Sequence, residues 1–156
     1  MTSFASRFAA KVLRTRWVVR APIGLYRAHL GFLFGKRLIM IEHLGRTSGV
    51  WRRVVVEVVD HDDDSFSVIA GFGEKTQWLR NLEAHPDCRI FVGTRYRVPA
   101  RAERLSPDEA GAAIRAYAVR HPGAWEKLVP VFEETLGAPI TLGGTSLPMV
   151  RLKLAE

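Results

Sequence analysis

The spacing of hydrophobic and polar positions changes along this chain, from helical spacing in its first part to alternation after residue 36. Between residues 4 and 19, apolar side chains recur every three or four positions, and Arg7, Lys11 and Arg14 fall on the opposite side. This spacing predicts an amphipathic basic helix. Residues 23–34 predict a second short helix, which ends at Gly35. The chain is therefore expected to begin with two helices, the first of which has a basic face.

After residue 36, alternating stretches separated by short turns dominate the sequence. Strands are predicted at residues 37–44, 51–60, 65–72, 88–92, 95–105 and 147–154, and helices at residues 77–84, 107–120 and 124–136. This order predicts an α+β fold, a small barrel of about six mainly antiparallel strands with peripheral helices. We expect a single barrel domain at residues 22–156, preceded by a separate amphipathic basic helix at residues 1–21.

The composition is that of an ordinary soluble domain. The 156 residues are 47% hydrophobic and 25% charged, which argues against a disordered tail, a fibre or a polytopic membrane protein. No stretch reaches the roughly 18 consecutive apolar residues that a membrane-spanning helix needs. Cys88 is the only cysteine, so no disulfide can form within the chain. A reducing compartment is favoured, and we expect a cytoplasmic protein.

The positive charge is concentrated in the first third of the chain. The net charge is +7; residues 1–53 hold 11 basic residues and one acid (+10), and residues 54–156 hold 12 basic and 15 acidic residues (−3). Nucleic acid, an anionic membrane surface or a phosphorylated small molecule could use this charge. The helix at residues 4–19 suits either a peripheral anchor on the inner face of the membrane or packing over the barrel. Nucleic acid is the least favoured, because no aromatic strand for base stacking accompanies the basic residues.

Several common catalytic constellations are missing from the sequence. The five histidines are scattered without metal-ligand spacing, and there is no nucleophile elbow, phosphate-binding loop or dinucleotide fingerprint. Cys88 begins a predicted strand, which favours a buried, unreactive thiol over a nucleophile. The acidic run Asp62–Asp64 is typical of a solvated turn. The sequence therefore predicts no metal site and argues against a metalloenzyme or a covalent hydrolase.

Two glycine-containing segments remain as candidate binding sites. Residues 45–53 place three arginines, two hydroxyls and two glycines between two strands, a set that suits phosphate oxygens. The alternative is a hairpin turn with solvated arginines. Residues 71–78 lead from a strand into a helix, and two glycines there permit close approach of the backbone to a ligand. Trp78 either packs against a planar cofactor or belongs to the core.

Together the two segments resemble those of a known enzyme family. The turn at residues 45–52 (GRTSGVWR) and the helix at residues 78–86 (WLRNLEAHP) resemble the Gly-Arg-x-Ser-Gly-x-x-Arg turn and the Trp-x-x-Asn-Leu-x-x-x-Pro helix of nitroreductase-family deazaflavin-dependent oxidoreductases. The resemblance covers residues 25–120. Thr47 is a departure, because many members carry Lys at this position.

The resemblance implies a split β-barrel of the FMN-binding type that binds coenzyme F-420, an 8-hydroxy-5-deazaflavin with a phosphate and a polyglutamate tail. It also implies hydride transfer between the reduced deazaflavin and an electron-poor small-molecule acceptor, as in nitroreductases and quinone reductases. The alternatives are an FMN-dependent oxidoreductase on the same barrel and a non-catalytic protein that binds an anionic ligand or a membrane surface. The oligomeric state stays open.

The resemblance further implies which residues bind the cofactor. Residues of the turn would hold the phosphate, residues of the following strand would lie beside the ribityl chain and ring, and the glycine segment and helix would complete the pocket. The implied set is Arg46, Thr47, Ser48, Gly49, Arg52, Arg53, Val54, Val55, Ala70, Gly71, Gly73, Lys75, Trp78 and Asn81. Tyr117 is the candidate proton donor or substrate contact, and the alternative for its side chain is packing between Ala113 and His121.

Overall fold

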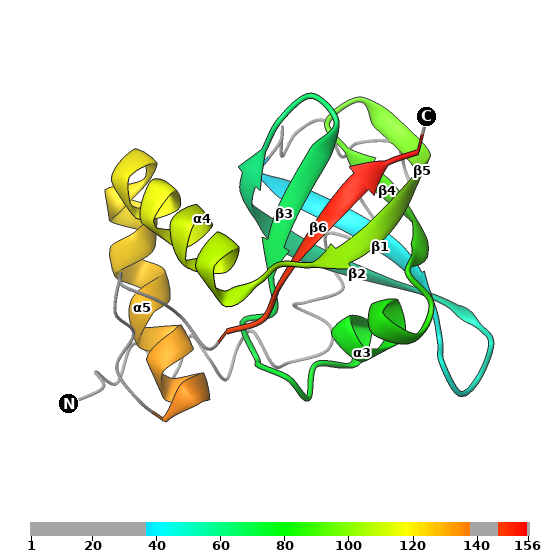
Figure 1. Ribbon diagram of the computed structural model, residues 1–156, viewed down its shortest axis with the longest axis horizontal. Helices are drawn as coiled ribbons and strands as arrows, with labels where there is room; N and C mark the ends of the chain where they lie inside the picture. The colour runs from blue at the N-terminus through cyan, green and yellow to red at the C-terminus, as the bar shows by residue number, and fades with distance from the viewer. Residues whose placement is uncertain (1–36, 138–146, 156) are drawn as a thin grey trace.

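The computed structural model describes residues 37–137 and 147–155 (Figure 1). The predicted helices at residues 4–19 and 23–34 lie outside the described residues. Within them, every predicted strand and helix is present, and no boundary differs by more than three residues. The elements are β1 (Leu38–Leu44), β2 (Trp51–His61), β3 (Ser65–Ile69), α3 (Gln77–Ala84), β4 (Asp87–Val92), β5 (Arg95–Arg104), α4 (Pro107–Arg120), α5 (Pro122–Leu136) and β6 (Met149–Leu154).

The six strands form a closed antiparallel barrel in the order β1-β2-β3-β6-β5-β4. The first three strands are a meander, and β1 also pairs with β4. The last strand, β6, pairs with both β3 and β5, and β5 pairs with β4. Every strand therefore has a partner on each side, which leaves no open sheet edge. The prediction of an α+β barrel of six antiparallel strands is confirmed.

Three element boundaries differ from their predicted positions by two or three residues. β6 begins at Met149, two residues later than predicted, and the other two differences have identifiable reasons. β3 ends three residues early because Gly73 N donates to Ala70 O at 2.9 Å, which closes a turn and directs the chain out of the sheet. α5 begins two residues early, at Pro122. Proline is favourable at the first helical position, where its missing N–H has no intrahelical partner to lose.

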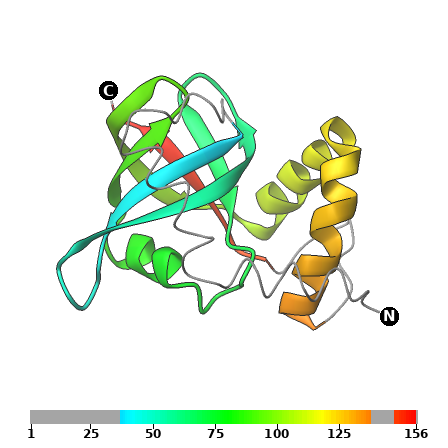
Figure 2. The same ribbon diagram turned by 180° about the vertical axis from the view of Figure 1, so that it is seen from behind.

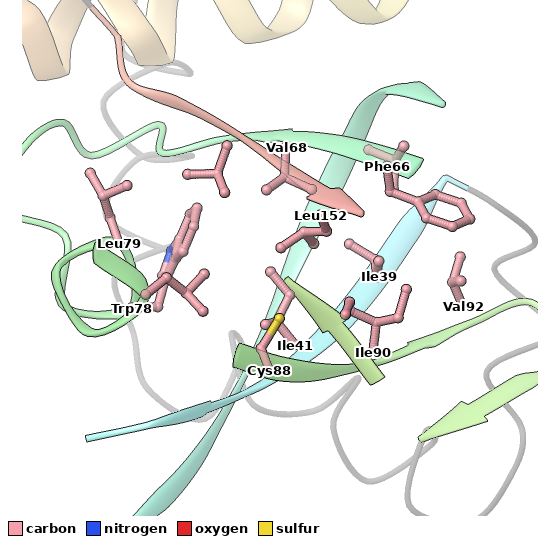
Figure 3. Close-up of a cluster of buried hydrophobic side chains, with 14 of the residues drawn as sticks. Ile39, Ile41, Phe66, Val68, Trp78, Leu79, Cys88, Ile90, Val92 and Leu152 are labelled. Atoms are coloured by element: carbon pink, nitrogen blue, oxygen red, sulfur yellow. The ribbon is translucent and has the colours of Figure 1, made fainter. Parts of the chain in front are cut away.

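Apolar side chains from all six strands and from α3 fill the barrel interior (Figure 3). Because side chains alternate along a strand, every second residue of β1 and β3 reaches this interior. Trp78, Leu79 and Leu82 of α3 close one end of it, below the barrel in Figure 1. The fully buried members are Ile39, Ile41, Val68, Ala70, Leu79, Ile90 and Leu152. Cys88 is also buried among them, as the sequence predicted.

A second apolar cluster joins α4 and α5 to the outside of the barrel. Figures 1 and 2 show these two helices side by side on one flank of the barrel. α4 begins with a capping box, in which Ser106 Oγ accepts from Glu109 N at 3.2 Å and the Glu109 carboxylate accepts from Ser106 N at 2.9 Å. None of the helices in the described part of the chain is long and apolar enough to cross a membrane.

Candidate functional site

The turn between β1 and β2 has a shape that favours glycine at two positions. Gly45 N donates to Val50 O at 2.8 Å, and Gly49 N donates to Gly45 O at 2.9 Å. Gly49 has a φ of +66°, in the left-handed region that favours glycine. A side chain at Gly45 would collide with the Ser48 hydroxyl and would crowd the Val50 carbonyl oxygen. The conformation of this turn is therefore well defined.

Arg46 joins this turn to α3. Its backbone N–H and its Nη1 both donate to Asn81 Oδ1, at 3.2 and 2.7 Å, and its Nη2 donates to Gln77 Oε1 at 2.9 Å. Asn81 is 4% exposed, and Arg46 is half-buried. The two segments that the sequence singled out are 35 residues apart along the chain, and the structure joins them into one unit.

His43 lies beneath Asn81 and completes this unit. Its side chain is 3% exposed, and its Nδ1 is 3.1 Å from Asn81 Nδ2. Burial, and after it the charge of Arg52, which is the cross-strand partner of His43, lower the pKa of His43 to about 4. The imidazole is therefore neutral at neutral pH, and the positive charge at this end of the barrel comes from arginines.

Arg52 and Ser48 both lie against Gly45, the residue before Arg46. A Cβ at Gly45 would be 3.5 Å from Arg52 Nε, and Ser48 Oγ accepts from Val50 N at 3.3 Å. Thr47, Ser48 and Gly49 are exposed. The structure thus brings two of the three predicted arginines to one turn, together with the two predicted hydroxyls.

Arg53 faces the opposite side of β2 and contacts a buried carboxylate. Its Nε donates to Glu42 Oε2 at 3.0 Å, while Arg89 Nη1 donates to Glu42 Oε1 at 2.7 Å and Arg97 Nη2 lies 3.7 Å from the same oxygen. Burial alone would raise the pKa of Glu42, but the hydrogen bonds from Arg89 and Arg53 lower it overall. Arg53 is therefore engaged within the protein, away from Arg46 and Arg52.

Val54 and Val55 also point to opposite faces of β2. Val54 packs against the barrel interior, whereas Val55 packs against Met40 and Phe91 on the outside. Only one of these two side chains can face a given ligand. A ligand that runs along β2 would have to contact the other residue through its backbone.

The glycine segment after β3 is shaped by its neighbours. Ala70 is fully buried in the barrel interior, and a Cβ at Gly71 would be only 2.9 Å from Cε1 of Phe132 on α5. Gly73 has a φ of +81°, and its carbonyl oxygen accepts from Thr76 Oγ1 at 2.6 Å. Gly71 thus allows close packing of α5, and Gly73 allows the turn into α3.

Trp78 and Lys75 differ sharply in their surroundings. Trp78 is 8% exposed and points into the barrel interior, so it belongs to the core (Figure 3). Lys75 is exposed in the turn before α3. This turn is anchored by Arg104 of β5, which forms ion pairs with Glu74 in the turn and with Glu83 on α3.

Tyr117 lies at a distance from the turn, on α4. Its hydroxyl donates to Glu57 Oε1 at 2.6 Å, and its ring is 3% exposed in the second apolar cluster. Burial, and after it the hydrogen bond and charge of Glu57, raise the pKa of the Tyr117 hydroxyl. Ala113 is buried in the same cluster, and the ring centroids of Tyr117 and His121 are 5.2 Å apart. These contacts match the alternative of packing between Ala113 and His121, and catalysis by Tyr117 stays a prediction.

The arrangement at the turn suits a phosphate better than a metal ion. Arginine and hydroxyl donors beside an exposed glycine turn are the groups that bind anionic oxygens. Among the described residues, no group of three or more His, Cys, Asp or Glu side chains could hold a metal ion. Arg46, Ser48 and Arg52 therefore form the core of the candidate site, which we call the turn site.

A hollow of about 570 Å³ opens elsewhere on the surface, and none of its lining residues belongs to the turn site. Acidic and basic side chains both line this hollow, so it does not form a uniformly positive site for an anion. Its lining residues are Asp60, His61, Asp62, Asp64, Ser65, Ser67, Arg151, Lys153, Leu154 and Ala155. In Asp62, hydrogen bonds from Asp64 N and the Ser65 side chain lower the pKa of the carboxyl, as expected of a solvated turn.

The sequence pattern did not single out His43 and Gln77 as part of the site. His43 follows the inward-facing residues Ile39 and Ile41 at a spacing of two, so the alternation places a polar ring in the apolar interior. A polar side chain on a buried face indicates a specific hydrogen-bond partner. That partner, Asn81, lies on a distant segment, and therefore only the folded structure reveals the contact.

The fold and the site define the class of protein as a small antiparallel barrel with an arginine-containing glycine turn at one end. Residues 18–128 match the model of the F-420H(2)-dependent quinone reductase family. This match covers more than half of the chain, and the chain belongs to that family. Among curated proteins, none matches this sequence.

Several solved structures share the fold. A structure described as a domain-swapped dimer is 16% identical, with a TM-score of 0.57, over 89% of this chain and 98% of that one. An F-420-H2-dependent reductase is also 16% identical, with a TM-score of 0.53, over 76% and 96% of the two chains. A putative pyridoxamine 5'-phosphate oxidase from Listeria innocua is 9% identical, with a TM-score of 0.53, over 85% and 94%. The barrel is of the split-barrel, FMN-binding-like type.

Family membership defines the cofactor and the type of reaction. The protein is an oxidoreductase, a reductase that uses coenzyme F-420. The residues of the turn site fit the phosphate of this cofactor, since two arginines and two hydroxyls surround a turn with a left-handed glycine. The family that matches is one of quinone reductases, and its description does not name nitroreductases.

Proposed function

We propose that the protein transfers hydride from reduced coenzyme F-420 to a quinone-type acceptor, and that the turn site holds the phosphate of the cofactor. The family is one of quinone reductases, which supports a quinone-type acceptor. The observation that carries the site is the attachment of Arg46 to α3 through Asn81 and Gln77. When bound, coenzyme F-420 supplies the hydride chemistry, and the chain supplies binding and orientation.

The attachment of Arg46 leaves part of its guanidinium group for a ligand. A guanidinium has five N–H donors. Within the described residues, Asn81 and Gln77 accept from two of the five, which leaves three for phosphate oxygens. Ordering a long side chain costs about 1.5–2 kcal/mol. Because Arg46 is already held in the free protein, a phosphate that binds there does not need to order it.

β2 runs from the turn site to Glu57, the hydrogen-bond partner of Tyr117. Arg52 and Glu57 are five residues apart on this strand, which corresponds to about 17 Å at roughly 3.3 Å per residue. Glu57 accepts the hydrogen bond of Tyr117, and the raised pKa keeps the tyrosine protonated at neutral pH. Because the two residues are an odd number of positions apart, the side chains of Arg52 and Glu57 leave opposite faces of β2, and a cofactor anchored at Arg52 would not reach Tyr117 along one face of the strand. Tyr117 is retained as a proposed substrate contact on the outer side of the barrel.

Titration of the purified protein with coenzyme F-420, followed by cofactor fluorescence, tests the proposed binding site. Arg46→Ala and Arg52→Ala should each weaken binding about tenfold or more, since a hydrogen bond to a charged group contributes roughly 1.5–3 kcal/mol. The matched control is Arg101→Ala, which removes one positive charge from an exposed ion pair with Asp87. Equal affinities in all four proteins would rule out the turn site.

The acceptor is tested separately by following oxidation of reduced coenzyme F-420 with a water-soluble quinone or a nitroaromatic compound. We expect turnover with the quinone to exceed that with the nitroaromatic compound. Turnover with the nitroaromatic compound alone would contradict the quinone assignment. Saturable binding of FMN without binding of coenzyme F-420 would favour an FMN-dependent enzyme on the same barrel.

A further inference from the structure

The buried histidine beneath the turn site is not explained by packing alone. His43 occupies an inward-facing position of β1, where apolar Ile39 and Ile41 precede it, and it is 3% exposed. Burying a polar ring is unfavourable unless it gains a hydrogen bond. The partner in this structure is the side-chain amide of Asn81, which is itself 4% exposed. The pair therefore forms a buried polar contact between the apolar barrel interior and the arginines of the turn site.

The contacts of Asn81 determine which nitrogen of His43 carries the proton. Asn81 Oδ1 receives two donors, Arg46 N and Arg46 Nη1, so the amide oxygen must face Arg46. Its amide nitrogen then faces His43, at 3.1 Å from Nδ1. Because Nδ2 is a donor only, His43 Nδ1 must accept, and the ring proton is on Nε2. Only the neutral Nε2–H tautomer satisfies this chain of hydrogen bonds.

We propose that His43 is a positioning residue for the phosphate-binding arginine: through Asn81, it holds both the backbone and the guanidinium group of Arg46 in the orientation that receives the cofactor. This inference rests on the proposed function, because it assigns the ligand of Arg46 to be the cofactor phosphate. His43 itself touches no ligand in this scheme. Its contribution is to fix the rotation of the Asn81 amide, which otherwise could turn its nitrogen toward Arg46.

Two substitutions at position 43 distinguish an acceptor role of the side chain from a packing role. His43→Leu fills the same interior space but has no acceptor for Asn81 Nδ2. His43→Gln restores an acceptor, because its side-chain oxygen can receive that hydrogen bond. The matched control is His85→Leu, at an exposed histidine just after α3.

Affinities for two ligands provide the first readout: coenzyme F-420, and the deazaflavin alcohol that lacks the phosphate and the glutamate tail. His43→Leu should weaken binding of coenzyme F-420 about tenfold, the effect expected for one buried hydrogen bond. It should leave affinity for the phosphate-free deazaflavin within about twofold, and His43→Gln should recover most of the loss. An equal loss for both ligands, no loss for either, or a failure of His43→Gln to recover binding would overturn the proposal.

Hydrogen exchange of backbone amides provides a second readout that needs no cofactor. In His43→Leu, the Arg46 amide, which donates to Asn81 Oδ1, should exchange about tenfold faster than in the unmodified protein. The Gly45 amide donates to Val50 O in the same turn and should be unchanged. Equal acceleration at both amides would indicate general loosening of the turn and would refute the positioning role. Absence of cofactor binding by the unmodified protein would instead refute the proposed function, and the exchange result would still decide the role of His43.

Discussion

The buried, neutral His43 makes the stability of the protein depend on pH between about 4 and 6.5. Its pKa is about 4 in the folded protein and 6.5 in an unfolded chain. Between these two values, the unfolded chain binds a proton that the folded protein does not bind. Acid therefore favours the unfolded state: the stabilisation is complete above pH 6.5 and is lost as the pH falls toward 4.

The size of this effect follows from the difference between the two pKa values. The full difference of about 2.5 units corresponds to about 3.4 kcal/mol, at roughly 1.36 kcal/mol per unit. Between pH 7 and pH 4.5, the linkage relation gives a loss of about 2.4 kcal/mol in the free energy of unfolding. The side chain is almost fully buried, so solvent screening does not substantially reduce the effect.

Urea unfolding at pH 7 and pH 4.5, followed by the fluorescence of the tryptophans, including buried Trp78, measures this loss. In His43→Gln, the decrease in unfolding free energy between the two pH values should be about 2 kcal/mol smaller than in the unmodified protein. Carboxyl groups with lowered pKa values, such as Glu42, titrate in both proteins and cancel in the comparison. His85→Gln should behave like the unmodified protein. The same decrease in His43→Gln and in the unmodified protein would refute a buried neutral His43.

Three further predictions concern other parts of the molecule. Gly45→Ala should destabilise the protein by about 1–3 kcal/mol in urea unfolding and weaken binding of coenzyme F-420, because the new methyl group would collide with Ser48. Unchanged stability would contradict this prediction and show that the turn can relax. Cys88 should react with an aromatic disulfide reagent only in denaturant, because burial, and after it the charge of Asp87, raise its pKa to about 12; rapid labelling of the native protein would contradict this. We also propose that residues 4–19 anchor a cytoplasmic protein to anionic membranes. The full chain should co-sediment with anionic liposomes in a salt-sensitive way, whereas a chain starting at residue 21 should not. Equal sedimentation of the two chains would disprove the anchor.

Local sequence signals predicted the secondary structure of the described residues well. The alternation at residues 51–60 correctly separates Val54, Val56 and Val58, which face the interior, from Glu57, which bonds Tyr117 outside. The Ser-Pro-Asp-Glu start of α4 forms the expected capping box. These signals are reliable because they depend on hydrogen bonds and burial within a few neighbouring residues.

The candidate site was only partly predictable. The motif pair brought Arg46, Ser48, Arg52 and Asn81 to attention, and the structure places these residues together at the turn. The same reasoning added Arg53, which pairs with buried Glu42 on the other face of β2, and its contact with the cofactor stays a prediction. The alternation of strand residues already places Arg52 and Arg53 on opposite faces, but it does not reveal which face carries the site.

By itself, the sequence determined the order of the elements, the class of fold and the location of the arginine-rich turn. Each of these depends on the period of hydrophobic positions or on turn chemistry, and both are local properties. The tertiary structure decided which polar groups meet: His43 from β1, Asn81 from α3 and Arg46 from the turn between β1 and β2. Contacts between segments that are 35 to 38 residues apart depend on how the barrel closes, and no local pattern encodes that closure.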